Sequence, residues 1–344
     1  MAAQGQGTSL KSYVLTRLAL VVPMVLILLT MVFLLMRVAP GDPVSASLGG
    51  HVPRAVVNKI RHQLGFDKPI TTQYGNYLWD VARGDFGTTI TDRRSVRQII
   101  SVNGAATLEL TFAAMIVAIF VGVAIGLIAG RFRDTPLDVG GRLFGIVIYA
   151  MPVFFLGFLA QLVFGVWLGV LPTSDQADPI TQATMQTHTN IFLVDAVIDD
   201  NWSAFWDIFK HLILPATTLG LVIGGIFIRL IRVNVIRTLK DDYIEAARAR
   251  GIPERSVVYR HAFRNALVPV ITVVGLQMAL LLSGAVLTET TFNWPGIGHE
   301  LIFYLQNRDY TGVQGIIVVF ALIVVFFSLL IDLVSAAIDP RIRY

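Results

Sequence analysis

Residues 110–130 read LTFAAMIVAIFVGVAIGLIAG and contain no charged side chain. A helix needs about 20 apolar residues to cross the hydrocarbon core of a bilayer, so this stretch is long enough to span it. Inside lipid the backbone polar groups must bond within the segment, which makes such a span helical. Five comparable uncharged stretches occur elsewhere in the chain. The six are Leu18–Met36, Leu110–Gly130, Leu143–Leu171, Leu212–Ile228, Ala266–Thr288 and Tyr310–Ile331.

The composition also indicates a membrane protein. Of the 344 residues, 55% are hydrophobic and only 15% are charged, and the mean hydropathy is +0.68. The high hydrophobic fraction excludes a disordered chain. A soluble domain is nearer a quarter charged, so a water-soluble enzyme is disfavoured. The absence of cysteine excludes thiolate zinc sites, iron–sulfur clusters and disulfides. A cleaved signal peptide at the first span is disfavoured, because the apolar run is long and distant from the small residues Val44-Ser45-Ala46.

The basic residues of the connections predict the orientation. Arg131–Arg142 carries three basic residues and Arg229–Asn265 carries nine, whereas Pro172–His211 has one against six acids and Glu289–Asp309 has one against three. Loops rich in Arg and Lys stay in the cytoplasm, which places both termini there. Arg37–Glu109 has nine basic residues and must lie outside, but its 73 residues exceed the length for which the rule holds.

We therefore expect an all-α membrane protein with six transmembrane helices, both ends in the cytoplasm, and a folded extracytoplasmic loop after the first helix. A cytoplasmic tail, 1–12, precedes a transmembrane domain, 13–344. The expected spans are about 13–36, 107–130, 143–171, 211–232, 266–288 and 310–334, with an external loop at 37–106 and a cytoplasmic loop at 233–265. Arg229 and Arg232 are expected to snorkel to the interface, and Glu109 is interpreted as interfacial.

The first external loop has the pattern of a folded cap. Val56–Leu64 has apolar residues at helical spacing and is followed by Gly65, a residue suited to end a helix. Pro40-Gly-Asp-Pro43 and Arg83-Gly-Asp-Phe-Gly87 predict turns on either side. We favour a cap without chemistry over a docking surface.

The second long external loop contains an amphipathic stretch, Phe192–Phe209, in which Trp202 and Trp206 are four residues apart. Tryptophan near the end of a span is typical of the headgroup region, so this stretch predicts an interfacial helix.

The cytoplasmic loop predicts two helices joined by a sharp turn. Asp241 or Asp242 can cap a helix of roughly ten residues, Gly251 can take a left-handed conformation, and Pro253 can open a second helix that continues to Asn265. A plain solvated connector explains the arginines but not this construction. A DNA-binding helix-turn-helix is disfavoured because both ends join membrane spans. A docking element for a cytoplasmic partner remains.

At Glu245-Ala-Ala-Arg-Ala-Arg-Gly251 this loop resembles the "EAA" loop of ABC importer permeases. Over nearly the whole chain from about Tyr13, the order of motifs is similar to the dipeptide/oligopeptide permease family, and more specifically to the first, B-type, of its two membrane subunits. The motifs are Pro40-Gly-Asp-Pro43, Leu64-Gly-Phe-Asp-Lys-Pro69, Arg83-Gly-Asp-Phe-Gly87, Thr107-Leu-Glu-Leu110, Tyr149-Ala-Met-Pro152, His211-Leu-Ile-Leu-Pro215, His261-Ala-Phe-Arg-Asn-Ala-Leu-Val-Pro269, Gly275-Leu-Gln277, Leu287-Thr-Glu-Thr290, Asn293-Trp-Pro-Gly-Ile-Gly298, Asn307-Arg-Asp-Tyr310 and Asp339-Pro-Arg-Ile-Arg343.

The resemblance implies an assembly in the bacterial inner membrane. A C-type permease would share the translocation path, two ATPase subunits would dock from the cytoplasm, and an extracytoplasmic solute-binding protein would deliver a peptide. Carried over, Glu245, Ala246, Ala247 and Gly251 would contact the ATPase, with the small residues Ala246 and Ala247 forming a face that it approaches closely. The chain itself would bind no cofactor and no nucleic acid, because ATP and Mg²⁺ would be used by the partner subunits.

The motifs that the sequence lacks also indicate that the energy for transport must come from a partner. The chain has no G-x-x-x-x-G-K-[ST] phosphate loop, and His299-Glu300 is not followed by the second histidine of a zinc protease motif. A self-sufficient secondary transporter would show ionisable groups within the spans, but only Asp332 stands out there. An intramembrane enzyme would need a pair of catalytic residues at membrane depth. Dipeptides are the favoured cargo; oligopeptides, glutathione or nickel remain alternatives.

Two further groups of candidate residues follow from the expected spans. The translocation path would be lined by polar or aromatic groups, although packing between helices is an alternative role for each. These path candidates are Tyr149, Met151, Gln161, Gln277, Ser283 and Thr288.

The outer gate is expected after the fifth span, where Trp294-Pro295-Gly296 forces a turn and Ile297–Leu305 predicts a short helix. The alternative is a simple interfacial loop anchored by Trp294 and Tyr304. The gate candidates are Glu289, Asn293, Trp294 and His299.

Overall fold

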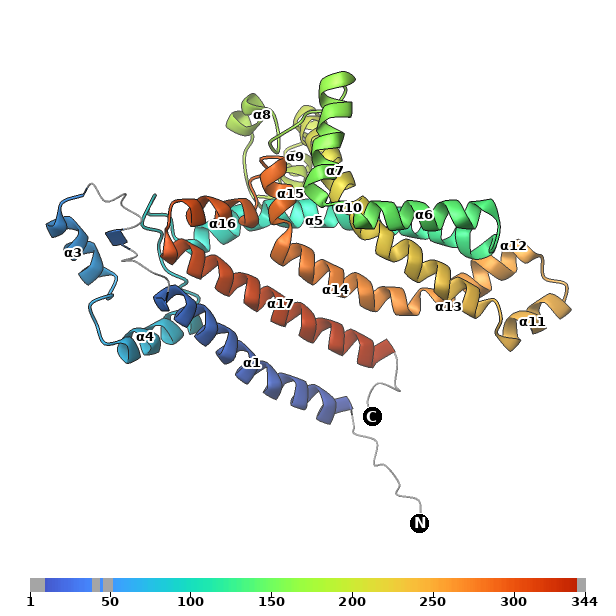
Figure 1. The fold of residues 1–344 in the computed structure, drawn as a ribbon, viewed down its shortest axis with the longest axis horizontal. Helices are drawn as coiled ribbons and strands as arrows, with labels where there is room; N and C mark the ends of the chain where they lie inside the picture. Colours follow the sequence, from blue (N-terminus) through green and yellow to red (C-terminus); the bar gives the residue numbers. More distant parts are fainter. Residues whose placement is uncertain (1–9, 39–43, 46–51, 339–344) are drawn as a thin grey trace, which may run out of the picture. The chain divides into compact units, whose positions relative to one another are not determined.

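The computed structural model describes residues 10–38, 44–45 and 52–338, and within these ranges helices dominate; the β-pairing found there is a bridge between Thr88 and Ser95 (Figure 1). The expected all-α class is confirmed. The helices are α1 (Leu10–Val38), α3 (Arg54–Gln63), α4 (Ile70–Ala82), α5 (Val96–Arg131), α6 (Pro136–Ala150), α7 (Val153–Ala160), η1 (Gln161–Trp167), α8 (Pro179–Thr184), α9 (Phe192–Ile198), α10 (Trp202–Thr238), α11 (Asp242–Ala249), α12 (Glu254–Ser256), η2 (Val257–Ala262), α13 (Phe263–Ala266), α14 (Val268–Gly284), α15 (Val286–Thr291), α16 (Ile297–Gln306) and α17 (Tyr310–Ile338).

The chain forms two compact units. The first comprises Met1–Thr107, Leu282–Val286 and Pro295–Tyr344, and the second comprises Leu108–Leu281 and Leu287–Trp294. Each unit is described by itself below.

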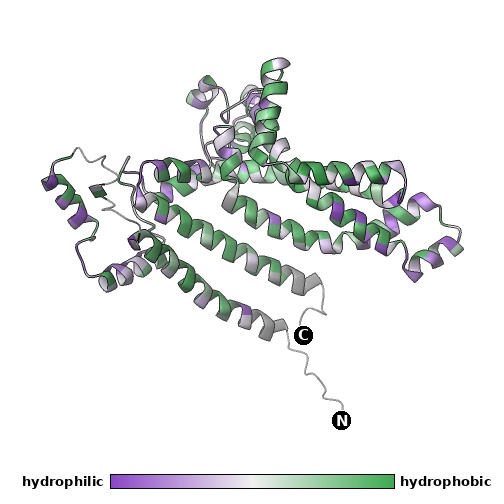
Figure 2. Ribbon diagram, viewed as in Figure 1, coloured by the Kyte–Doolittle hydropathy of each residue, from purple (hydrophilic) through white to green (hydrophobic). Residues whose placement is uncertain are grey.

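Four helices in the described part of the chain are long and apolar enough to cross a membrane. They include Leu15–Arg37 of α1, all of α5 and α10, and Tyr310–Ile331 of α17, and they are largely green in the hydropathy colouring of Figure 2. Two bent pairs of helices pass the same test together, so the count of candidate spans is four, or up to six if each pair is one span. The expected six spans correspond to the larger count.

The third expected span, 143–171, is not one straight helix. The α6 helix ends at Ala150, and the chain bends by 102° before α7 and the π-helical η1 continue to Trp167. Pro152 explains the bend, because it lacks an N–H and disfavours helical geometry at the preceding residue. Accordingly, Met151 has an extended conformation with ψ 132°.

The fifth expected span, 266–288, is also interrupted. The run Glu254–Ala266 meets Pro269–Leu282 at a bend of 52°, where Pro269 cannot donate the helical hydrogen bond. A second interruption separates α14 from α15 at Ala285. By contrast, α1 continues through Pro23 and α10 through Pro215.

The amphipathic stretch Phe192–Phe209 is two elements rather than the single expected helix. The α9 helix ends at Ile198, Asp200 adopts a left-handed φ of 49°, and α10 begins at Trp202. Asn201 caps α10 by accepting a hydrogen bond from Ala204 N at 3.1 Å. The two tryptophans therefore lie on the first turns of α10.

In the first unit, α4 packs against α1 as the expected folded cap. The Thr30 and Tyr74 hydroxyls are 2.6 Å apart, and Arg37 donates to Gln73 Oε1 at 3.1 Å and to Gln314 Oε1 of α17 at 3.0 Å. The expected helix at Val56–Leu64 is present as α3, and Gly65 ends it with φ 70°.

The turn expected at Arg83–Gly87 is confirmed as well, since Gly84 and Gly87 have φ values of 75° and 92°. The expected turn at Pro40–Pro43 lies outside the described residues.

The second unit is built around α10. Its glycines and those of α5 allow close helix contact: a Cβ placed at Gly220 would lie 2.6 Å from Ala114 O, and one at Gly126 would lie 2.8 Å from Ile228 O. Small residues at such positions let membrane helices approach through their backbones.

The predicted orientation can be measured directly, because the wild-type chain contains no cysteine. A cysteine at Asp241 should be protected from a membrane-impermeant thiol reagent applied to intact cells, because the basic loop holds it inside. A cysteine at Lys59 should be labelled under the same conditions. Labelling at Asp241 in intact cells would contradict the predicted topology.

Candidate functional site

The loop at 233–265, which the sequence predicts to be cytoplasmic, forms the expected pair of helical limbs. Asp241, in an extended conformation, is the N-cap residue of α11, although its side chain makes no capping hydrogen bond. Gly251 takes the left-handed conformation with φ 75°, and its N–H bonds to Arg248 O at 2.9 Å. Pro253 precedes α12, the start of the second limb.

A small core holds the two limbs together. Ile244 and Ala247 of α11 are buried against Val257 and Ala262 of η2. A bidentate ion pair closes the turn, because Arg248 donates to Glu254 Oε2 at 3.0 Å and to Glu254 Oε1 at 2.8 Å. The hydrogen bond to Glu254 raises the pKa of Arg248. The loop is thus an ordered helical hairpin rather than a solvated connector.

The four candidate coupling residues differ in how exposed they are. Glu245, Ala246 and Gly251 are exposed, whereas Ala247 is only 4% exposed and packs inside the hairpin. Ala247 therefore does not belong to the exposed small-residue face that the sequence predicted. Glu245 and Ala246 belong to the surface of this part of the loop that is open to a partner.

One path candidate lines a cavity. Tyr149, at the end of α6, borders a space of about 500 Å³ between α6 and α10. Gly145 and Gly225 form part of its wall, and Arg142 and Arg229 contribute cationic groups. This cavity is in the second unit and combines an apolar wall with basic groups.

The other path candidates have different surroundings. Gln161 donates from Nε2 to Thr173 O at 2.7 Å and to Thr291 O at 3.0 Å. Its side chain thus connects segments of the protein, in line with the alternative role in helix packing. Thr288 is buried at 1% exposure, while Met151 and Gln277 are half-buried. Ser283 belongs to α14, but its side chain lies outside the described residues. The described structure does not bring these residues together into one site.

Three gate candidates lie in the second unit. Glu289 and Trp294 are both fully buried, and Trp294 N bonds to Glu289 O at 2.8 Å. Asn293 is exposed with a left-handed φ of 49°, and its amide donates to Asp175. Asp175 N in turn donates to Phe292 O at 2.9 Å. These contacts join the end of α15 to the second external loop.

His299 lies in α16 of the first unit, so the four gate candidates are divided between the units. The helix expected at Ile297–Leu305 is confirmed as α16. The side chains of Trp294 and Tyr304 are both 0% exposed, which argues against the anchoring role that the alternative, a simple interfacial loop, gives them.

The second unit contains a buried ion pair that was not predicted from the sequence. Asp138 of α6 is 0% exposed and accepts hydrogen bonds from Arg232 of α10 at 2.5 and 2.8 Å. The side chain of Arg232, expected to snorkel to the interface, thus pairs with an acid of the connection 131–142. The only sequence signal was a pair of acids, Asp134 and Asp138, in a basic connection, and this does not identify the partner of either.

Glu109, interpreted from the sequence as interfacial, is buried within the protein. It accepts hydrogen bonds from Gln176 Nε2 at 2.5 Å and from Leu193 N at 2.8 Å. Both partners belong to the second external loop, so this carboxylate fixes that loop on α5.

A third unrecognised network lies in the first unit. Arg94 donates to Glu300 of α16 at 3.0 Å and to Asn103 of α5 at 3.0 Å, and Asn103 donates to Pro295 O at 2.9 Å. These bonds tie the end of the first external loop to the segment before the last span.

Tyr304 and Asp92 extend this network through a hydrogen bond of 2.9 Å. Burial raises the pKa of Tyr304, and the bond to Asp92 adds to that increase. Burial alone would raise the pKa of Asp92, but the hydrogen bonds from Thr89 and Tyr304 lower it. The carboxylate thus stays ionised near neutral pH.

Comparisons with known proteins identify the family. Residues 122–344 match the binding-protein-dependent transport system inner membrane component, and residues 10–94 match the N-terminal part of a binding-protein-dependent transport system membrane component. The chain belongs to this family. The resemblance inferred from the motifs is confirmed, and the chain is a non-catalytic permease subunit of an ABC transporter.

Several curated relatives are similar over almost their full length. The dipeptide transport system permease protein DppB of Alkalihalophilus pseudofirmus is 36% identical, and the di/tripeptide transport system permease protein DppB of Pseudomonas aeruginosa is 38% identical. The glutathione transport system permease protein GsiC of Salmonella typhimurium is 36% identical. Each alignment covers 97% of this chain and 99% of the relative.

Proposed function

We propose that this permease imports short peptides, with dipeptides favoured, from an extracytoplasmic binding protein into the cytoplasm. It forms the translocation path with a C-type permease and is driven by two ATPase subunits that use ATP and Mg²⁺. The proposal is supported by relatives whose names specify dipeptide and di/tripeptide transport. A relative whose name specifies glutathione transport is 36% identical to this chain, so glutathione is the second candidate cargo.

The observation that carries the coupling role is the ordered hairpin at the cytoplasmic loop. Its own core is complete, since Ile244 and Ala247 are buried within it, yet Glu245 and Ala246 stay exposed on α11. A rigid element with an exposed small residue can fit a groove on a partner, and a rigid connection to α10 can transmit movement of that partner. We place the ATPase contact on this face, with Gly251 setting the angle of the turn.

Two substitutions test the coupling. Ala246→Trp should block close approach of the ATPase, and Gly251→Val should distort the left-handed turn at a cost of about 1–3 kcal/mol; a Cβ at Gly251 meets no atom within 4 Å, so the effect is backbone strain rather than collision. Both variants should insert in the membrane but lose most of the ATPase stimulation by peptide-loaded binding protein in proteoliposomes. Arg133→Trp, in the other expected cytoplasmic connection and also exposed, should retain that stimulation. Full stimulation in both hairpin variants would exclude the coupling role.

The cargo is tested in the same proteoliposomes. Uptake of a labelled dipeptide should be reduced by excess unlabelled dipeptide and much less by glutathione or a pentapeptide. If glutathione is the stronger competitor, the second candidate replaces the first.

A further inference from the structure

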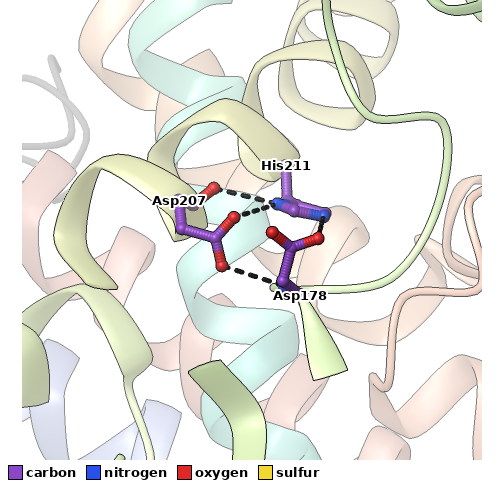
Figure 3. Close-up of side chains that lie close together, drawn as sticks. All are labelled: Asp178, Asp207 and His211. Atoms are coloured by element: carbon purple, nitrogen blue, oxygen red, sulfur yellow. Dashed lines mark hydrogen bonds and ion pairs between the residues drawn. The ribbon is translucent and has the colours of Figure 1, made fainter. Parts of the chain in front are cut away.

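Three side chains on the second unit form a cluster with metal-ligating chemistry outside every site described above. Asp178 precedes α8, whereas Asp207 and His211 are four residues apart on the first turns of α10. One ligand atom from each of the three lies within 4.8 Å of the others. Figure 3 shows the imidazole flanked by the two aspartates.

The hydrogen bonds fix the tautomer of the histidine. His211 Nδ1 lies 2.9 Å from the backbone carbonyl of Asp207. A carbonyl oxygen only accepts, so Nδ1 carries the proton, and in the neutral imidazole Nε2 then presents a lone pair. Metal-binding histidines almost always donate their second ring N–H to a carbonyl or carboxylate in this way.

The lone pair of Nε2 is directed at another acceptor. Asp178 Oδ1 lies 3.8 Å from Nε2, which is too far for a hydrogen bond. The His211 side chain is only 5% exposed, so water has little access to it. Two ligands at about 2.1 Å from one tetrahedral zinc ion are about 3.4 Å apart, close to the observed separation.

Asp207 holds this pair in place. Its Oδ2 accepts a hydrogen bond from the Asp178 backbone N–H at 2.9 Å, and its Oδ1 is 3.4 Å from His211 Nδ1. The backbone of Asp178 is therefore bonded to α10. The Asp178 side chain is 69% exposed, so it can rotate to coordinate an ion. The two carboxylates supply the charge that a divalent cation neutralises.

We propose that Asp178, Asp207 and His211 form a binding site for a divalent transition-metal ion of the Zn²⁺ type. His211 Nε2 and the Asp178 carboxylate are the protein ligands, Asp207 positions both of them from the Nδ1 side of the imidazole, and water fills the remaining positions. Imidazole with carboxylate suits such ions, whereas Mg²⁺ and Ca²⁺ prefer oxygen ligands alone. The ion fastens the loop that carries Asp178 to α10.

The test uses the full chain in detergent, purified without a polyhistidine tag. Zn²⁺ should bind with one ion per chain after dialysis and raise the thermal transition temperature by several degrees, whereas Mg²⁺ should not. Asp178→Asn should lower the Zn²⁺ affinity at least tenfold, and His211→Asn should abolish stoichiometric binding. Because Asp178 is exposed, its variant keeps the experiment decisive even if the His211 variant fails to fold.

A matched control is present in the same loop. His188 Nε2 and Asp199 Oδ1 lie 2.8 Å apart and already form a hydrogen bond, with no third ligand in the cluster. His188→Gln should therefore leave Zn²⁺ binding unchanged. Equal binding by the wild type and the Asp178→Asn variant, or no binding by the wild type, would overturn the proposal.

Discussion

Arg232→Met should be among the most destabilising single substitutions in the second unit. It leaves the fully buried Asp138 carboxylate without the two hydrogen bonds that Arg232 provides at 2.5 and 2.8 Å. Removing one partner of a buried ion pair costs about 3–5 kcal/mol. Asp138 then keeps only the backbone N–H of Asp134 at 3.0 Å and the half-exposed Arg142 at 3.6 Å, so its buried charge is poorly compensated. We expect a strongly lowered thermal transition in detergent and a reduced amount of protein in the membrane.

Two further variants separate the ion pair from general damage. Arg142 Nε is 3.6 Å from Asp138 Oδ1, but the Arg142 side chain is 47% exposed, so Arg142→Met should have a much smaller effect. Combining Asp138→Leu with Arg232→Met should recover much of the lost stability, since a hydrophobic pair of similar size needs no charge compensation. If Arg232→Met is no worse than Arg142→Met, the ion pair does not hold α6 on α10.

Gly220→Leu should prevent α10 from packing on α5. A Cβ at Gly220 would lie 2.6 Å from Ala114 O and 2.7 Å from Val117 Cβ. Backbone atoms cannot move aside cheaply, and overpacking of this kind costs about 1–3 kcal/mol or more. The expected result is loss of folded permease, measured as aggregation on size-exclusion chromatography and absence from the membrane fraction.

A glycine one turn further on provides the control. At Gly224 the nearest atom to an added Cβ is Val121 Cγ1 at 3.5 Å, an ordinary contact. Gly224→Ala should therefore be nearly neutral, whereas Gly220→Ala should already lower stability. Equal tolerance of alanine at both positions would show that the two helices are not packed this closely.

The turn at Gly251 was predictable from the sequence because it depends on local conformation. Only glycine takes a positive φ without strain, and the proline two residues later cannot continue the helix. The bend at Pro152 follows from the same local rules, although its size of 102° does not. The hydrophobic stretches were recognisable for a similar reason, since crossing a bilayer requires a continuous apolar run in the chain itself.

Long-range partners were not predictable in this way. Asp138 and Arg232 are 94 positions apart, and Glu109 and Gln176 are 67 positions apart, so no local pattern connects them. The family resemblance pointed to the coupling loop, but it could not show which alanine faces outward. Ala247 is buried only because η2 returns against α11 and covers it.

The sequence by itself indicated that the chain belongs in a lipid bilayer rather than in water, and it determined the positions of the apolar helices. It also determined the residues that form the turn at Gly251, and the family. These properties depend on composition, on spacing along one helix and on the order of short motifs. The tertiary structure alone decided which polar groups meet, including the cluster of Asp178, Asp207 and His211. The physical reason is that a buried polar group must find a partner in space, and that partner is chosen by how distant helices pack.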